Sequence, residues 1–165
     1  ISITCLAPTK AFNLAGLQTA AVAVADPVLR HRVWRGLNTD EVAEPNVFAV
    51  PAAVAAFTKG EQWLDEFRDY VFENRRIAGE FIEKNIPEIF SVKGDATYLM
   101  WLDCKKTGLD SDALAESLRK NTGLFVSSGT QYGGNGRDFL RVNIACPRAV
   151  LYDGLDRLNR GIKMI

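Results

Sequence analysis

Lys10 follows a short β-branched stretch, residues 2–6, and stands among turn-forming residues, Pro8, Asn13 and Gly16. Burial disfavours the charged ammonium form of a lysine, and a neutral amine attacks a carbonyl carbon to form a Schiff base. Most lysines in turns, however, are solvated and charged. The residues around Lys10 therefore leave two interpretations open, a nucleophilic amine and an ordinary surface lysine.

Arg141 is a second residue whose type suits binding or catalysis. It lies in residues 139–144, which we predict to be a strand. A guanidinium is always charged, and its planar fork of donors matches a carboxylate bidentately. Held on a strand, such a group fixes the orientation of a substrate that carries a carboxylate. A solvent-exposed arginine on an edge strand is the alternative, and on the residues alone it is the simpler interpretation.

Several other classes of function are disfavoured by composition. Twenty basic and twenty acidic residues cancel, so we expect no nucleic-acid or anionic-membrane partner. No apolar run has the length of about 20 residues that a membrane span needs. The only histidine is His31, and no paired Cys/His spacing predicts a metal site. The three widely spaced cysteines, Cys5, Cys104 and Cys146, are typical of reduced thiols in a cytoplasmic protein.

Residues 7–18 carry a recognisable motif, Ala-Pro-Thr-Lys-Ala-Phe-Asn-Leu-Ala-Gly-Leu-Gln. It resembles the cofactor-lysine motif of fold-type I pyridoxal 5'-phosphate (PLP) enzymes, in particular MalY/PatB-type cystathionine β-lyases (C–S lyases) of the class I/II aminotransferase superfamily. The resemblance implies that Lys10 is the catalytic lysine that forms a Schiff base with PLP. Ala11 replaces the usual threonine, and Ala7 stands where many members place a serine that contacts the cofactor phosphate.

A second motif, residues 139–148, reads Phe-Leu-Arg-Val-Asn-Ile-Ala-Cys-Pro-Arg and resembles the corresponding segment of the same family. The resemblance implies that Arg141 binds the α-carboxylate of an amino-acid substrate. The glycine-rich stretch 129–136, which contains Tyr132, matches a loop that lines the entrance in the family. A flexible turn between strands is the alternative interpretation of these glycines.

Asn46 lies in the Glu-Pro-Asn-Val stretch 44–47. This stretch is similar to a superfamily segment that reaches the cofactor phosphate of the partner subunit, so the resemblance implies a cofactor-binding role for Asn46 and a homodimer. Asn46 is equally well placed to cap the helix that we predict to follow. The two roles do not exclude each other.

The remaining pattern predicts the elements that position these residues. In the first half we predict strands at 2–6 and 18–25 and helices at 27–36, 47–59 and 61–84. In the second half we predict strands at 89–92, 97–102, 124–127 and 139–144 and helices at 111–121 and 147–162. Tyr98 and Trp101 are interpreted as packing residues of a strand.

The resemblance implies an α/β fold, the C-terminal part of a fold-type I PLP-dependent transferase. Residues 1–60 would belong to the large PLP-binding domain, residues 61–87 to a linking helix, and residues 88–165 to a small α+β domain. The chain begins with Ile1 inside a predicted strand, and family members are much longer, so we expect a part upstream. Because that part would supply most of the cofactor contacts, we expect residues 1–165 alone to bind PLP weakly and to be inactive.

For the whole protein the resemblance implies a cytoplasmic, homodimeric C–S β-lyase. It would cleave cystathionine or related cysteine S-conjugates to a thiol, pyruvate and ammonia. A class I/II aminotransferase with the same lysine and arginine is one alternative. A folded module without enzymatic activity is the other.

Overall fold

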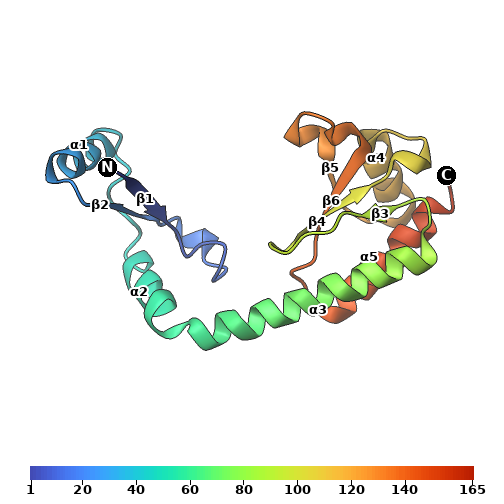
Figure 1. Ribbon diagram of the computed structural model, residues 1–165, viewed down its shortest axis with the longest axis horizontal. Coiled ribbons are helices and arrows are strands. Elements are labelled where there is room, and N and C mark those ends of the chain that lie inside the picture. Colours follow the sequence, from blue (N-terminus) through green and yellow to red (C-terminus); the bar gives the residue numbers. More distant parts are fainter. The chain divides into compact units, whose positions relative to one another are not determined.

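The computed structural model describes residues 1–165 and divides into two units, Ile1–Phe67 and Arg68–Ile165. Figure 1 shows the elements of each unit in chain colours. None of the helices combines the length and the apolar character that crossing a membrane would require. The two units are described separately below.

The first unit is built on a two-stranded hairpin. Strand β1 (Ile3–Leu6) pairs antiparallel with β2 (Ala21–Val24), and a short 3₁₀ helix, η1 (Ala15–Leu17), lies in the connection. Helices α1 (Pro27–Thr39) and α2 (Ala49–Lys59) follow. The unit ends inside the long helix α3 (Glu61–Asn85), which confirms the long helix predicted from the apolar spacing.

The residues of the first unit bury little of their apolar surface. Of residues 1–67, only Pro8, Val24 and Ala49 are buried. Large apolar side chains remain exposed on both strands and on or beside α1, α2 and α3, among them Ile3, Leu6, Val22, Trp34, Phe48, Val54, Phe57 and Trp63. This unit therefore has little core of its own, and a two-stranded hairpin by itself is only marginally stable in water.

The second unit contains a four-stranded antiparallel sheet with the order β3-β4-β6-β5. Its strands are β3 (Phe90–Ser91), β4 (Leu99–Asp103), β5 (Ser127–Ser128) and β6 (Phe139–Asn143). Helices α4 (Ser111–Thr122) and α5 (Arg148–Ile162) complete it, with three short 3₁₀ helices, η2 (Lys105–Thr107), η3 (Gly129–Tyr132) and η4 (Gly136–Asp138).

Alternation along the two central strands gives the sheet two different faces. Met100, Leu102 and Leu140 are buried, and the first two line one apolar cavity with residues of α3 and α5. Side chains alternate between faces along a strand. Trp101 and Arg141, which are opposite each other in the β4–β6 register, therefore lie on the other face, where both are half-buried.

Local signals explain the ends of α4. The Asp110 carboxylate accepts a hydrogen bond from the Ala113 amide at 2.9 Å, as expected of a residue that caps a helix start. Gly123 follows the last turn with φ of 71°, a left-handed conformation that favours glycine.

The predicted strand at 124–127 was wrong in position, because only Ser127 and Ser128 pair with β6 and Phe125 is exposed.

Two glycines of α5 make a matched test of packing. A Cβ on Gly161 would collide with the buried Leu118 side chain, whereas a Cβ on Gly154 would meet only Leu124 at 3.9 Å. We expect Gly161→Ala to destabilise the fold, since overpacking costs about 1–3 kcal/mol. Gly154→Ala should stabilise it by about 0.5–1 kcal/mol, because alanine loses less backbone entropy in a helix. Urea unfolding of both variants measures the difference, and equal changes would contradict it.

Candidate active site

Lys10 lies in the turn that follows β1, and its side chain is exposed. The Phe12 amide donates to the Pro8 carbonyl at 2.9 Å, and the Leu14 amide donates to the Thr9 carbonyl at 3.0 Å. These two bonds reverse the chain around Lys10. No hydrogen bond or ion pair of the structure involves the Lys10 amine, which is exposed to solvent.

Phe12 fixes this turn to the junction of α2 and α3. Its ring stacks on Trp63, with centroids 6.0 Å apart, and meets Phe57 edge-on at the same distance. Gly60 lies directly against the ring, since a Cβ there would come within 2.5 Å of a Phe12 ring carbon. No pattern in the sequence indicated these contacts, which bring together residues distant along the chain.

Asn46 stands at the entry to α2. Its side-chain oxygen accepts from the Phe48 amide at 2.8 Å, and its backbone carbonyl accepts from the Ala49 amide at 2.9 Å. The side-chain amino group has no partner in the chain. Asn46 also lines an open hollow of about 790 Å³ between the hairpin, α1 and α2, and Lys10 is not among the residues of that lining.

Arg141 has an aromatic neighbour and no acidic one. Its guanidinium carbon lies 4.6 Å from the centroid of the Tyr132 ring, within the range of a cation–π contact. One nitrogen also donates to the Ser127 hydroxyl over a long 3.5 Å. No carboxylate of the chain pairs with Arg141, so a half-buried, permanently charged group keeps most of its donors for another molecule.

A second aromatic residue, Trp101, lies beside Tyr132 and Arg141. Trp101, its register partner on β4, meets Tyr132 edge-on, with centroids 5.4 Å apart and planes at 88°. The sequence interpretation of Trp101 as a packing residue missed that it packs against the ring that contacts Arg141. Antiparallel pairing of the two predicted strands was the signal that could have placed Trp101 beside Arg141.

Lys10 and Asn46 belong to residues 1–67, and Arg141 belongs to residues 68–165. Within the first unit, Lys10 and Asn46 do not line one cavity. No group of three or more His, Cys, Asp or Glu side chains is arranged to hold a metal ion.

The three cysteines are free and differ in their surroundings. Burial raises the pKa of the Cys104 thiol to about 12, and it also raises the pKa of Cys146, while Cys5 is exposed. Only the thiolate is nucleophilic, so we expect iodoacetamide at pH 8 to alkylate Cys5 quickly and to leave Cys104 unmodified. Mass spectrometry of peptides measures both, with a urea-unfolded sample as control. Equal labelling of the two in the folded chain would contradict this expectation.

Comparison with known sequences places these motifs in context. The profile of the aminotransferase class I and II family matches residues 3–158. The chain is 38% identical to the cystathionine β-lyase PatB of Bacillus subtilis over 98% of its own length and 42% of the relative's. It is 30% identical to protein MalY of Escherichia coli over 95% of its length and 40% of the relative's. The chain thus spans about two fifths of these relatives.

Solved structures give the same picture. Cystalysin from Treponema denticola, which contains PLP, superimposes with a TM-score of 0.91 at 30% identity, over 98% of this chain and 41% of that one. The PLP-bound C–S lyase of Staphylococcus hominis gives a TM-score of 0.83 at 30% identity, over 97% of this chain and 42% of that one.

Proposed function

The chain belongs to the aminotransferase class I and II family, and from this we propose that it is part of a PLP-dependent C–S β-lyase. The relatives named cystathionine β-lyase and the PLP-bound C–S lyase structure support this activity. The proposed substrates are cystathionine and related cysteine S-conjugates. The proposed products are a thiol, pyruvate and ammonia.

The donor groups of this chain fit the anchoring of PLP. Lys10 offers an exposed primary amine without a protein partner, which is the group that bonds to an aldehyde. Asn46 offers an unused side-chain amino group that could donate to the cofactor phosphate of a partner subunit. The chain spans about two fifths of its relatives, and in this proposal the rest of the cofactor contacts would come from outside these residues, so we expect residues 1–165 alone to bind PLP weakly and to be inactive.

The observation that carries the proposal is the unpaired guanidinium of Arg141. A charged donor that is half-buried and pairs with no acid in the chain is available to a negative ligand, and the α-carboxylate of an amino acid is such a ligand. Two parallel hydrogen bonds to that carboxylate fix the orientation of the substrate.

The chemistry divides between this chain and its cofactor. Bound PLP supplies an electron sink for the charge that develops at the substrate Cα. Arg141 holds the carboxylate, and the Lys10 amine accepts the proton from Cα as general base. The substrate and one water are converted to a thiol, pyruvate and ammonia.

The assembly and location of the whole protein are part of the proposal. Exposed apolar side chains beside Asn46, on Val47, Phe48 and Val50, support a homodimer in which this region lies at the subunit interface. Free cysteines, one of them buried, support a cytoplasmic location. The three-part division into a large-domain part (1–60), a linking helix (61–87) and a small domain (88–165) stays a prediction.

A chimera tests the activity. This chain replaces the matching part of B. subtilis PatB, and the purified protein is loaded with PLP and given L-cystathionine. We expect pyruvate, measured with lactate dehydrogenase, and an equal amount of thiol, measured with a disulfide reagent. A folded, PLP-loaded chimera that forms neither product would overturn the proposal.

An aminotransferase is the second candidate, because the matching family is named for that activity. It would use the same lysine and arginine, but it would pass the amino group to a 2-oxo acid. The same chimera is therefore assayed with L-cystathionine and 2-oxoglutarate. Glutamate formation without thiol release would favour the aminotransferase.

A further inference from the structure

We propose that Tyr132 is a positioning residue for Arg141, held in place by a hydrogen-bonded network beneath its turn. The proposal rests on the proposed function, because it treats Arg141 as the group that binds the substrate carboxylate. It adds a residue that touches neither the cofactor nor the substrate in this scheme. Tyr132 acts by restricting where the guanidinium lies.

The contact between Tyr132 and Arg141 leaves the donors of the arginine free. The guanidinium carbon lies over the ring at 4.6 Å from its centroid, and the attraction is between the positive charge and the ring face. An acidic neighbour would hold the arginine through its N–H groups and so compete with a carboxylate ligand. A ring holds it without using them, and the tyrosine hydroxyl makes no hydrogen bond in the chain.

The Tyr132 ring is itself held by a cluster of aromatic side chains on the half-buried face of the sheet. It meets Trp101 edge-on with ring centroids 5.4 Å apart, and Phe139 also meets Trp101 edge-on, with centroids 5.9 Å apart. Trp101 is opposite Arg141 in the strand register. Rotation of the Tyr132 ring away from Arg141 would also break its edge contact with Trp101.

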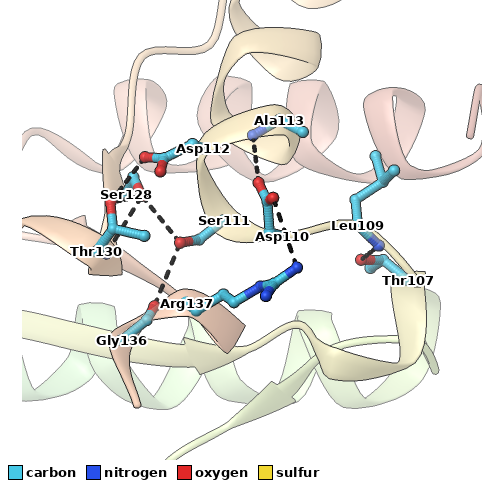
Figure 2. Close-up of polar contacts among 10 residues, drawn as sticks. All are labelled: Thr107, Leu109, Asp110, Ser111, Asp112, Ala113, Ser128, Thr130, Gly136 and Arg137. Atoms are coloured by element: carbon cyan, nitrogen blue, oxygen red, sulfur yellow. Dashed lines mark hydrogen bonds and ion pairs between the residues drawn. The ribbon is translucent and has the colours of Figure 1, made fainter. Parts of the chain in front are cut away.

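A polar network fixes the turn, η3, that carries Tyr132, and Figure 2 shows it. The Ser128 hydroxyl accepts from the Thr130 amide at 3.3 Å and lies 2.8 Å from the Ser111 hydroxyl. Ser111 donates to the Gly136 carbonyl at 3.2 Å, and the Thr130 hydroxyl donates to the Asp112 carboxylate at 2.8 Å. The start of α4 thus holds both ends of the loop that contains Tyr132.

Two glycines close this loop. A Cβ on Gly129 would collide with the Gly136 carbonyl, and a Cβ on Gly136 would collide with the Gly129 carbonyl. Both residues are buried, so neither backbone has room to move aside. The two ends of the loop that carries Tyr132 therefore lie backbone to backbone.

The first test measures the arginine directly, without cofactor or turnover. In the ¹⁵N-labelled full chain, at a low pH and temperature where exchange with water is slow, a guanidinium held over the ring gives an Arg141 Nε–H signal shifted by the ring current of Tyr132. We expect Tyr132→Phe to keep this signal and Tyr132→Leu to lose it. Phe125→Leu is the matched control and should keep the Arg141 signal. It also removes a ring beneath an arginine, since the Arg119 guanidinium carbon lies 5.3 Å from the centroid of the Phe125 ring.

The second test separates binding from chemistry in the PLP-loaded chimera. We expect Tyr132→Leu to raise KM for L-cystathionine about tenfold with little change in kcat. Tyr132→Phe keeps the ring, so its KM should stay near that of the unsubstituted chimera. Thr130→Val, which removes the bond to Asp112, should raise KM by a smaller factor. Circular dichroism and the melting temperature confirm that each variant is folded.

The outcomes distinguish the two proposals. If Arg141→Gln raises KM but Tyr132→Leu changes neither KM nor the Arg141 signal, the role of Tyr132 is wrong and the proposed function stands. If Arg141→Gln leaves KM unchanged, the carboxylate site itself is wrong. If Tyr132→Phe raises KM and loses the Arg141 signal as Tyr132→Leu does, the ring face is not what positions the arginine.

Discussion

Replacing Lys10 by alanine lowers pyruvate formation by the PLP-loaded chimera about 1,000-fold or more. The amine is both the covalent anchor of the cofactor and the general base in the proposed scheme, so the variant loses two contributions at once. Lys10→Arg should lose as much. A guanidinium keeps the positive charge, but with a pKa above about 12 it offers no neutral nitrogen.

Covalent attachment gives an independent measurement of the same residue. Borohydride reduction of the PLP-loaded chimera followed by peptide mass spectrometry should find the pyridoxyl group on Lys10. Lys59→Ala is the matched control, because Lys59 is an exposed lysine at the end of α2 in the same unit, and it should change neither rate nor labelling. Activity retained in Lys10→Ala, with the label on another lysine, would remove Lys10 from the mechanism.

Replacing Arg141 by glutamine lowers kcat/KM for L-cystathionine about 100-fold or more. Each charge-assisted hydrogen bond to a carboxylate contributes about 1.5–3 kcal/mol, and about 1.4 kcal/mol corresponds to a factor of ten. The loss should fall mainly on KM. Arg141→Lys should recover part of it, since a lysine restores the charge but not the planar fork.

Steady-state kinetics of the chimera measure this effect against a control of the same kind. Arg119 also lies over an aromatic ring, that of Phe125, but it belongs to α4 and its side chain is exposed. Arg119→Gln should leave kcat/KM within about twofold, as expected of a surface substitution. Equal effects of the two substitutions would show that loss of a surface arginine, rather than of a carboxylate site, explains the result.

The fold class was predictable because two short motifs at opposite ends of the chain resembled the same family. The match of the family over residues 3–158 and the superposition on cystalysin confirm it. Local rules also located several helix ends, but the end predicted for the first helix at Gly36 was wrong, because α1 continues to Thr39. Pro27 begins α1 behind the Asp26 cap, and Asp110 and Gly123 bound α4.

Contacts between distant segments were not predictable from these rules. The strand predicted at 124–127 was misplaced because pairing with Leu140 and Arg141, rather than β-propensity, determines which residues form β5. The ring over Arg141 was also missed, because Tyr132 comes from a glycine-rich turn without a periodic pattern. The roles of Lys10, Asn46 and Arg141 in binding stay predictions.

The scarcity of buried side chains in residues 1–67 bears on the order in which the protein assembles. Residues 68–165 have a core of their own, with Leu114, Leu118 and Leu140 fully buried, so they can fold as a unit. The unit that carries Lys10 has no comparable core, since only Pro8, Val24 and Ala49 are buried in it. We therefore expect the surroundings of Arg141 to form in residues 68–165 without the unit that carries Lys10.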